Sequence, residues 1–186
     1  PEDGDLEEAK TLMDQAQDPK TNVTLLLNDA PGHREIAVAV QQELKLPSLS
    51  VRWVPVTPEN RLDAVANGTV DIECGSTTNT LSRQERVDFT NMTFVDGGSL
   101  LVTAASAVRR VADLGGKKVA VIPGTTTEKA LAAALKKNGV NAEVVNVKEH
   151  IEGLRLLDTG GADAYASDRV LLIGLAGRGA STLHAY

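Results

Sequence analysis

The sequence has few aromatic residues, one cysteine, no long apolar segment and no excess of positive charge. Aromatic residues make up 3% of the 186 positions, too few for a surface that stacks on single-stranded nucleic acid. The net charge is −6, so the chain also lacks the basic face of a general nucleic-acid binder. No apolar run approaches the roughly 20 residues of a membrane helix. These absences predict a soluble globular protein without a nucleic-acid partner.

Metal and cofactor motifs are missing as well. The three histidines, His33, His150 and His184, lack metal-ligand spacing, and Cys74 has no neighbouring Cys or His. Neither the G-x-S-x-G motif of hydrolases nor the G-x-x-x-x-G-K-[ST] phosphate loop occurs. The sequence therefore predicts no metal and no cofactor. It begins at Pro1 without a methionine, and we expect a mature or trimmed chain.

Strand-like and helix-like segments alternate along the chain, which is typical of α/β folds with parallel sheets. In the first half we expect helices at 5–16, 33–45 and 58–68 and strands at 22–29, 49–56 and 69–75. Strand-like pieces follow at 87–90 and 97–104. The second half is expected to hold strands at 117–124, 141–147 and 162–167 and helices at 125–139, 148–160 and 168–177.

This alternation predicts two α/β lobes, each a parallel-rich sheet flanked by helices. We place the first lobe at 1–98 and the second at 107–186, with 99–106 as a hinge or simply an edge connection. A gapless internal repeat supports two similar lobes, because residues 61–76 align with 153–168. In this repeat Gly68 pairs with Gly160, and each is expected to end a helix in a left-handed conformation.

The segment "DIECGSTTNTLSRQERVDFT", residues 71–90, crowds hydroxyl groups beside Arg83 and Arg86. It is either a polar loop that serves only solubility or a cradle for an anion. In open parallel sheets, ligands bind beyond the carboxyl ends of the strands. Three predicted strands end there in polar residues, namely Gly75–Thr77, Gly124–Thr127 and Ser167–Asp168. If the lobes face each other, these groups share one cleft.

The chemistry of these strand ends suits a ligand that carries both a positive and a negative charge. Thr125 and Glu128 match a capping box, and the helix start behind them favours a carboxylate or phosphate. The alternative is that Thr125 only caps the helix. Arg83 offers a bidentate fork to a carboxylate, and Asp168 offers an acceptor to an ammonium group. Together they favour a zwitterionic ligand.

Several ordered motifs carry a family resemblance. The segment "VPVTPENRLDAVANGTVDIECGSTTNTLSRQERVDFTNMTFVDGGSLLV" strongly resembles the solute-binding proteins of polar amino-acid ABC transporters, in particular the glutamate/aspartate-binding branch. "DLGGKKVAVIPGTTTEKAL", "KEH" at 148–150 and "LDTGGADAYASDRVLL" continue the match, which covers about residues 46–176.

The resemblance implies a two-lobed, type II periplasmic-binding-protein fold that closes on its ligand. It implies eight ligand contacts: Arg61, Ser76, Thr77 and Arg83 on the first lobe, and Thr125, Thr126, His150 and Asp168 on the second. In the family, the Asp receives the ligand's α-amino group and the Arg its α-carboxylate.

The implied function is a periplasmic or extracellular receptor, without enzymatic activity, that hands an acidic or polar amino acid to an ABC permease. One alternative is a chimeric or truncated chain that keeps the fold but binds weakly or not at all. Another is a dehydratase on the same scaffold, which would need a positioned acid or base such as Glu73 or His150.

The sequence departs from the family pattern at both ends. It stops at Tyr186, where family members continue, and we expect the resulting exposed edge to favour a homodimer. The N-terminal part instead resembles peptide- or nickel-binding relatives and lacks the aromatic loop of the amino-acid branch. Arg34 in "GHRE" either replaces a family arginine or is an ordinary exposed helix residue.

Overall fold

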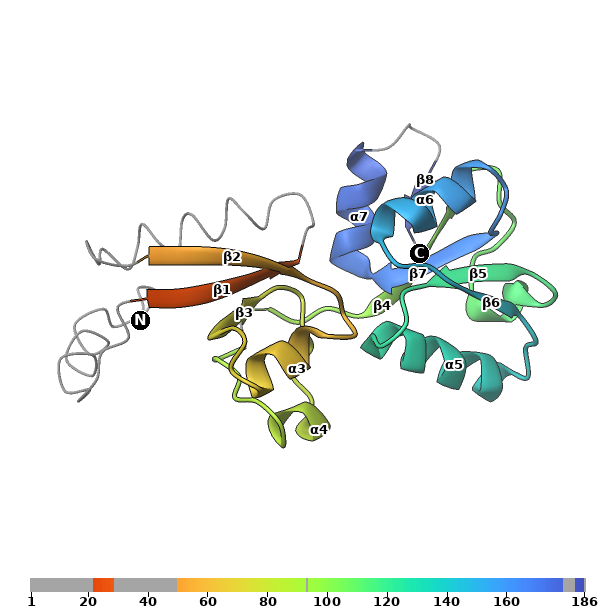
Figure 1. The fold of residues 1–186 in the computed structure, drawn as a ribbon. Helices are drawn as coiled ribbons and strands as arrows, with labels where there is room; N and C mark the ends of the chain where they lie inside the picture. Colours follow the sequence, from red (N-terminus) through yellow and green to blue (C-terminus); the bar gives the residue numbers. More distant parts are fainter. Residues whose placement is uncertain (1–21, 29–49, 93, 179–182, 186) are drawn as a thin grey trace. The chain divides into compact units, whose positions relative to one another are not determined.

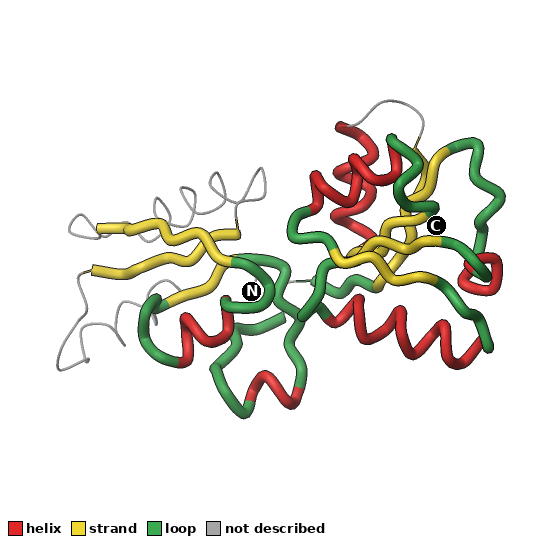
Figure 2. Tube along the Cα trace, turned by 45° about the vertical axis from the view of Figure 1, so that its right-hand side comes forward, coloured by secondary structure: helices red, strands yellow, loops and turns green. Residues whose placement is uncertain are grey.

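The computed structural model describes residues 22–28, 50–92, 94–178 and 183–185. The chain divides into two compact units, Pro1–Phe89 and Thr90–Tyr186, called unit 1 and unit 2 below. Each unit has its own sheet, as the strands in Figure 2 show. The predicted α/β class, with a parallel-rich sheet and helices in each half of the chain, is therefore confirmed.

Unit 1 contains a three-stranded parallel sheet with the strand order β2-β1-β3 in its described part. Its elements are β1 (Asn22–Asn28), β2 (Ser50–Val56), α3 (Arg61–Ala66), β3 (Ile72–Cys74) and α4 (Leu81–Gln84). Helix α3 begins later than the predicted residue 58, because residues 57–60 form a turn. In that turn the backbone N–H of Thr57 donates to Oδ1 of Asn60 at 2.8 Å.

Unit 2 contains a five-stranded sheet with the order β6-β5-β7-β4-β8 in its described part. Strands β6, β5 and β7 are parallel, and β4 is antiparallel to both β7 and β8. The elements are β4 (Gly98–Thr103), the 3-10 helix η1 (Val111–Leu114), β5 (Lys118–Val121), α5 (Thr126–Asn138), β6 (Glu143–Asn146), α6 (His150–Asp158), β7 (Ala164–Asp168), α7 (Arg169–Arg178) and β8 (Leu183–Ala185).

The helices of unit 2 cover both faces of this sheet (Figure 1). Alternate residues of β5 point to opposite faces, so Val119 and Val121 pack with Leu131 of α5, and Ala120 packs with Leu157 of α6. All three β5 residues are completely buried. Burial on two faces explains why β5 reads as a continuous apolar run.

Two glycines confirm the internal repeat at the level of the backbone. Gly68 follows α3 with φ 73°, and Gly160 follows α6 with φ 71°. Both are left-handed conformations, which glycine adopts without the steric cost of a Cβ atom. A left-handed glycine therefore ends one helix in each unit, before β3 in unit 1 and before β7 in unit 2.

The segments around the unit boundary differ from the sequence prediction. The predicted strand at 87–90 is wrong, because the N–H groups of Arg86 and Val87 both donate back to the carbonyl of Arg83 and close a turn. The predicted strand at 97–104, in contrast, is confirmed, because residues 98–103 form β4 of unit 2. A hinge motion at 99–106 stays a prediction. The predicted helices at 5–16 and 33–45, including Arg34, lie outside the described residues.

In the described part of the chain, every helix is too short or too polar to cross a bilayer.

Candidate functional site

In unit 1, the predicted contact Arg61 is the first residue of α3 and is 5% exposed. Its Nη1 atom lies 3.9 Å from Oε1 of Glu73 in β3. This distance exceeds a hydrogen bond but allows strong attraction between two largely buried charges. The pair holds the start of α3 beside the end of β3. It therefore places a cation next to the segment 76–80, which carries four hydroxyl residues and is called the hydroxyl loop below.

Two hydroxyl residues, Ser76 and Thr77, are half-buried directly after β3. The Oγ1 atom of Thr77 is buried and has no hydrogen-bond partner among the described residues. Buried polar atoms without partners are rare in folded proteins, because each loses its hydrogen bonds to water. The Thr77 hydroxyl is therefore a group that a bound ligand can satisfy.

The hydroxyl loop continues into α4, which the sequence analysis did not identify as a helix. Thr80 caps it by accepting a hydrogen bond from the backbone N–H of Arg83 at 3.3 Å. The half-buried Arg83 side chain donates from Nη1 to the carbonyl of Thr78 at 2.9 Å. A guanidinium group has five N–H donors in a fixed plane, so this bond helps to orient the Arg83 side chain.

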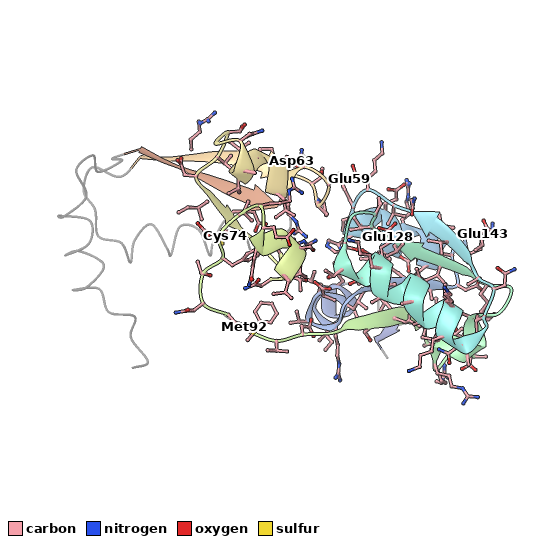
Figure 3. The ribbon with its side chains drawn as sticks, turned by 90° about the horizontal axis from the view of Figure 1, so that it is seen from below. Glu59, Asp63, Cys74, Met92, Glu128 and Glu143 are labelled. Atoms are coloured by element: carbon pink, nitrogen blue, oxygen red, sulfur yellow. The ribbon has the colours of Figure 1, made fainter. Side chains whose placement is uncertain are left out.

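Arg86 has a different environment from Arg83. Its Nη2 atom forms an ion pair with Oδ1 of Asp63 in α3, and both side chains are well exposed. The Asp63 side of this pair is visible in Figure 3. Arg86 therefore connects the turn after α4 to α3.

In unit 2, Thr125 is the N-cap of α5, which confirms the threonine half of the predicted capping box, whereas Glu128 bonds the N–H before the cap residue and not that of Thr125. Its Oγ1 accepts from the N–H of Glu128 at 3.1 Å and donates to the carbonyl of Ile122 at 2.8 Å. The Glu128 carboxylate accepts from the N–H of Gly124 at 2.9 Å. Figure 3 shows Glu128 at the start of α5. The half-buried Thr126 follows as the first helical residue.

Asp168 is the last residue of β7 and is half-buried. Its Oδ1 accepts a hydrogen bond from Oγ1 of Thr127 at 2.9 Å, and Thr127 is 8% exposed. This bond joins the first turn of α5 to the end of β7. The sequence analysis placed Thr127 among the polar residues at its strand end but not among the eight predicted ligand contacts.

His150 is the first residue of α6 and is half-buried. Its Nδ1 atom lies 2.7 Å from the hydroxyl oxygen of Tyr165 in β7. Burial raises the pKa of the Tyr165 hydroxyl well above its usual range, so this group stays protonated. Sequence reasoning missed Tyr165, because nothing in the strand "ADAYAS" distinguishes it from a core aromatic residue.

The parallel strands bring the predicted residues of unit 2 to one edge of its sheet. Thr125 and Thr126 follow β5, His150 follows β6 and Asp168 ends β7, and these strands are neighbours in the order β6-β5-β7. In unit 1, Arg61 follows β2 and Ser76 follows β3, on either side of β1. Each unit therefore gathers its predicted residues at the carboxyl edge, where open α/β sheets bind ligands.

Two other features do not contribute to these clusters. An open hollow in unit 2 is lined by residues 95–99 and Arg169, none of which was a predicted site residue. Burial raises the pKa of the Cys74 thiol, and the charge of Glu73 adds to this shift. A thiol of that kind is a poor nucleophile. Among the described residues, no three His, Cys, Asp or Glu side chains are grouped to hold a metal ion.

Comparison with known proteins identifies relatives of this arrangement. Residues 33–149 match the bacterial extracellular solute-binding proteins, family 3. The chain is 44% identical over 142 residues to the L-glutamate/L-aspartate-binding protein of Pseudomonas aeruginosa. It is 38% identical over 139 residues to the glutamate/aspartate import solute-binding protein of Salmonella typhimurium. Each alignment covers 75% of this chain and 46% of the relative, so the chain spans about half the length of these relatives.

The fold has counterparts among solved structures. One is an ancestral amino-acid-binding protein, a precursor of cyclohexadienyl dehydratase, with a TM-score of 0.75 and 22% identity. That comparison covers 97% of this chain and 79% of the other. At this identity, the likeness shows a shared fold.

Proposed function

Because the chain belongs to family 3 of the bacterial extracellular solute-binding proteins, we propose that it binds glutamate or aspartate outside the cytoplasm and delivers it to an ABC permease. The two relatives above, whose names specify glutamate and aspartate, support this choice of ligand. The protein acts as a receptor and leaves its ligand chemically unchanged.

Unit 1 supplies the contacts to the α-carboxylate of the ligand. The observation that carries this assignment is the buried Thr77 hydroxyl, which lacks a hydrogen-bond partner among the described residues. Ser76 adds a second hydroxyl at the same strand end, and Arg61 and Arg83 supply the cations of this unit, Arg61 beside Glu73 and Arg83 on the carbonyl of Thr78. Hydrogen bonds to a charged group contribute about 1.5–3 kcal/mol each, so a few of them support micromolar binding.

Unit 2 supplies the contacts to the rest of the ligand. Asp168 accepts from the α-ammonium group, and its bond from Thr127 fixes the carboxylate for that task. His150 and the first turn of α5, with Thr125 and Thr126, bind the side-chain carboxylate. A helix start favours an anion because its first N–H groups lack intrahelical partners.

Isothermal titration with a panel of ligands tests this proposal. The panel holds glutamate, aspartate, glutamine, asparagine, and glutarate, which lacks the ammonium group. The proposal predicts that glutamate or aspartate binds most tightly and that glutarate binds far more weakly, because Asp168 then has no cation to accept from. Tightest binding of glutamine or asparagine would contradict the choice of ligand.

The receptor role has its own test. After prolonged incubation with the protein, proton NMR of the bound amino acid, arogenate and prephenate should show each compound unchanged. Conversion of any of them would contradict the absence of enzymatic activity and favour a dehydratase.

Self-association stays a prediction that sizing chromatography with light scattering tests, since a monomer mass at high concentration would exclude a homodimer.

A further inference from the structure

Asp168 lies where a strand runs directly into a helix. It ends β7, and α7 begins at the next residue, Arg169, so Asp168 stands at the N-cap position of α7. Aspartate is among the residues most favoured at that position, where its carboxylate accepts from the N–H of the second or third helical residue. The second helical residue is Val170. A carboxylate turned to that N–H is committed to its own helix and less available to a ligand.

In the structure a different aspartate caps α7. Oδ2 of Asp96 accepts from the N–H of Val170 at 2.9 Å, and the carbonyl of Gly97 accepts from the N–H of Arg169 at 2.9 Å. A helix start leaves four backbone N–H groups without intrahelical partners, and these bonds satisfy the first two. The side-chain cap of α7 therefore comes from a residue 74 positions away in the chain.

The register of the sheet explains how Asp96 reaches α7. Strand β4 is antiparallel to β7, and its first residue, Gly98, lies opposite Asp168. Continued by two residues beyond β4, the same register places Asp96 opposite Val170. The chain before β4 therefore runs along the start of α7 and supplies both bonds.

A second contact holds the Asp168 carboxylate away from α7. Its Oδ1 accepts from Oγ1 of Thr127 in the first turn of α5, at 2.9 Å. The hydrogen bonds of the described residues leave Oδ2 of Asp168 for a ligand. Thr127 thus attracts the carboxylate toward α5, while Asp96 occupies the N–H for which Asp168 would otherwise compete.

We propose that Asp96 is a positioning residue for Asp168: by capping α7 it leaves the Asp168 carboxylate available to the α-ammonium group of the ligand. When the Asp96 carboxylate is removed, Asp168 turns to the N–H of Val170 and caps its own helix. The ligand half of this inference rests on the proposed function, whereas the competition for the cap does not.

A double-mutant cycle in urea tests the competition without any ligand. The full chain is compared with Asp96→Ala, Asp168→Ala and the variant that carries both. If Asp168 replaces the lost cap, Asp96→Ala is partly rescued and the double variant is not. The double variant should therefore raise the unfolding equilibrium constant about two- to tenfold more than the product of the two single increases, the effect of one N-cap. An increase equal to that product or smaller would overturn the proposal.

Hydrogen exchange of the Val170 amide reports on the same cap directly. Exchange should be faster in Asp96→Ala than in the parent protein, and faster again in the double variant, because the second acceptor is then missing too. Equal rates in Asp96→Ala and the double variant would show that Asp168 does not replace the cap, and would overturn the proposal.

Isothermal titration with glutamate tests the ligand half. Asp96→Ala should weaken binding about three- to tenfold, because Asp168 then divides its carboxylate between α7 and the ammonium group. Asp96→Asn keeps an oxygen acceptor, and asparagine caps helices about as well as aspartate, so its affinity should stay within about twofold of the parent. An alanine variant with parental affinity, or an asparagine variant as weak as the alanine variant, would overturn the positioning role.

The matched control is Asp113→Ala, which removes another carboxylate that accepts from the backbone in unit 2. Oδ2 of Asp113 accepts from the N–H of Arg109 at 3.0 Å and from that of Arg110 at 3.2 Å. This variant should leave glutamate binding unchanged, and a loss equal to that of Asp96→Ala would overturn the specific role of Asp96. If the parent protein binds no acidic amino acid, the proposed function and the ligand half both fail, and the urea cycle still decides the competition for the cap.

Discussion

The Thr127 hydroxyl donates a hydrogen bond of 2.9 Å to Oδ1 of Asp168 and so joins the first turn of α5 to the end of β7. The helix and the strand belong to different parts of the chain, 41 residues apart. Thr127 is 8% exposed, so the bond is shielded from water. Because the acceptor is a carboxylate, this single contact fixes the direction in which Asp168 presents its charge.

Thr127→Val tests the strength of that contact. Valine keeps the shape of threonine but leaves the carboxylate without its donor, so we expect a loss of about 1.5–3 kcal/mol in the free energy of unfolding. Urea denaturation measures it. Thr127→Ser is the matched control, because it keeps the hydroxyl and removes a methyl group. A serine variant that loses as much stability as the valine variant would contradict a role for the hydrogen bond.

Arg83→Ala and Arg86→Ala distinguish an anion cradle from diffuse positive charge. Each removes one arginine from the same loop, but only Arg83 lies half-buried beside the hydroxyl groups, and Arg86 pairs with Asp63. We expect Arg83→Ala to weaken glutamate or aspartate binding at least about tenfold, from the energy of one or two charged hydrogen bonds. Arg86→Ala should leave the affinity nearly unchanged.

Thermal unfolding of both arginine variants provides the control for folding. An exposed ion pair contributes at most about 1 kcal/mol, so Arg86→Ala should remain nearly as stable as the parent protein. Equal losses of affinity in the two variants would mean that the loop acts through its overall charge.

Gly153→Ala and Gly174→Ala form a matched pair of helical substitutions. At Gly153 the new Cβ collides with the Tyr165 ring at 2.7 Å, whereas nothing lies within 4 Å of the corresponding position at Gly174. Overpacking of this kind costs about 1–3 kcal/mol, and alanine in an open helix position gains up to about 1 kcal/mol. Urea denaturation should therefore show opposite signs. A stabilised Gly153→Ala variant would contradict the close packing of α6 on Tyr165.

Asp113 should contribute stability that depends on pH. A hydrogen bond from the backbone N–H of Arg109, 3.0 Å from Oδ2, holds the pKa of this carboxyl below its usual range. A lowered pKa means that the stabilisation is present above the unfolded pKa of about 3.9 and is lost as pH falls through the folded value. Thermal midpoints of the parent and Asp113→Asn should therefore differ at pH 7, and the difference should shrink as the pH falls below the unfolded pKa of about 3.9. A difference independent of pH would contradict this account.

The features predictable from sequence are those that neighbouring residues determine. The Thr125 N-cap needs only a hydroxyl residue at the start of the helix, and the turns at Gly68 and Gly160 need only a residue without a Cβ atom. The apolar run of β5 and its alternation with α5 likewise follow from periodicity. These local rules were sufficient for the α/β class and for the strand ends that carry the candidate site.

The contacts between distant elements could not be predicted in this way. The bond from Thr127 to Asp168 and the contact between Tyr165 and His150 both depend on which strands are neighbours and in which register. Residues 87–90 have a sequence typical of a strand, but turn bonds to the Arg83 carbonyl take the N–H groups of Arg86 and Val87. A strand pattern therefore fails where the backbone N–H groups are already hydrogen-bonded in the turn that ends a short helix.

Isothermal titration of the parent chain with glutamate and aspartate, against glutamine and asparagine, tests the central claim most directly. Micromolar affinity corresponds to about 8 kcal/mol, which a few charged hydrogen bonds supply. The account predicts saturable one-to-one binding of glutamate or aspartate at micromolar or lower concentration, with weaker binding of the two amides. No measurable binding of either acidic amino acid, or equal affinity for the acids and their amides, would contradict it.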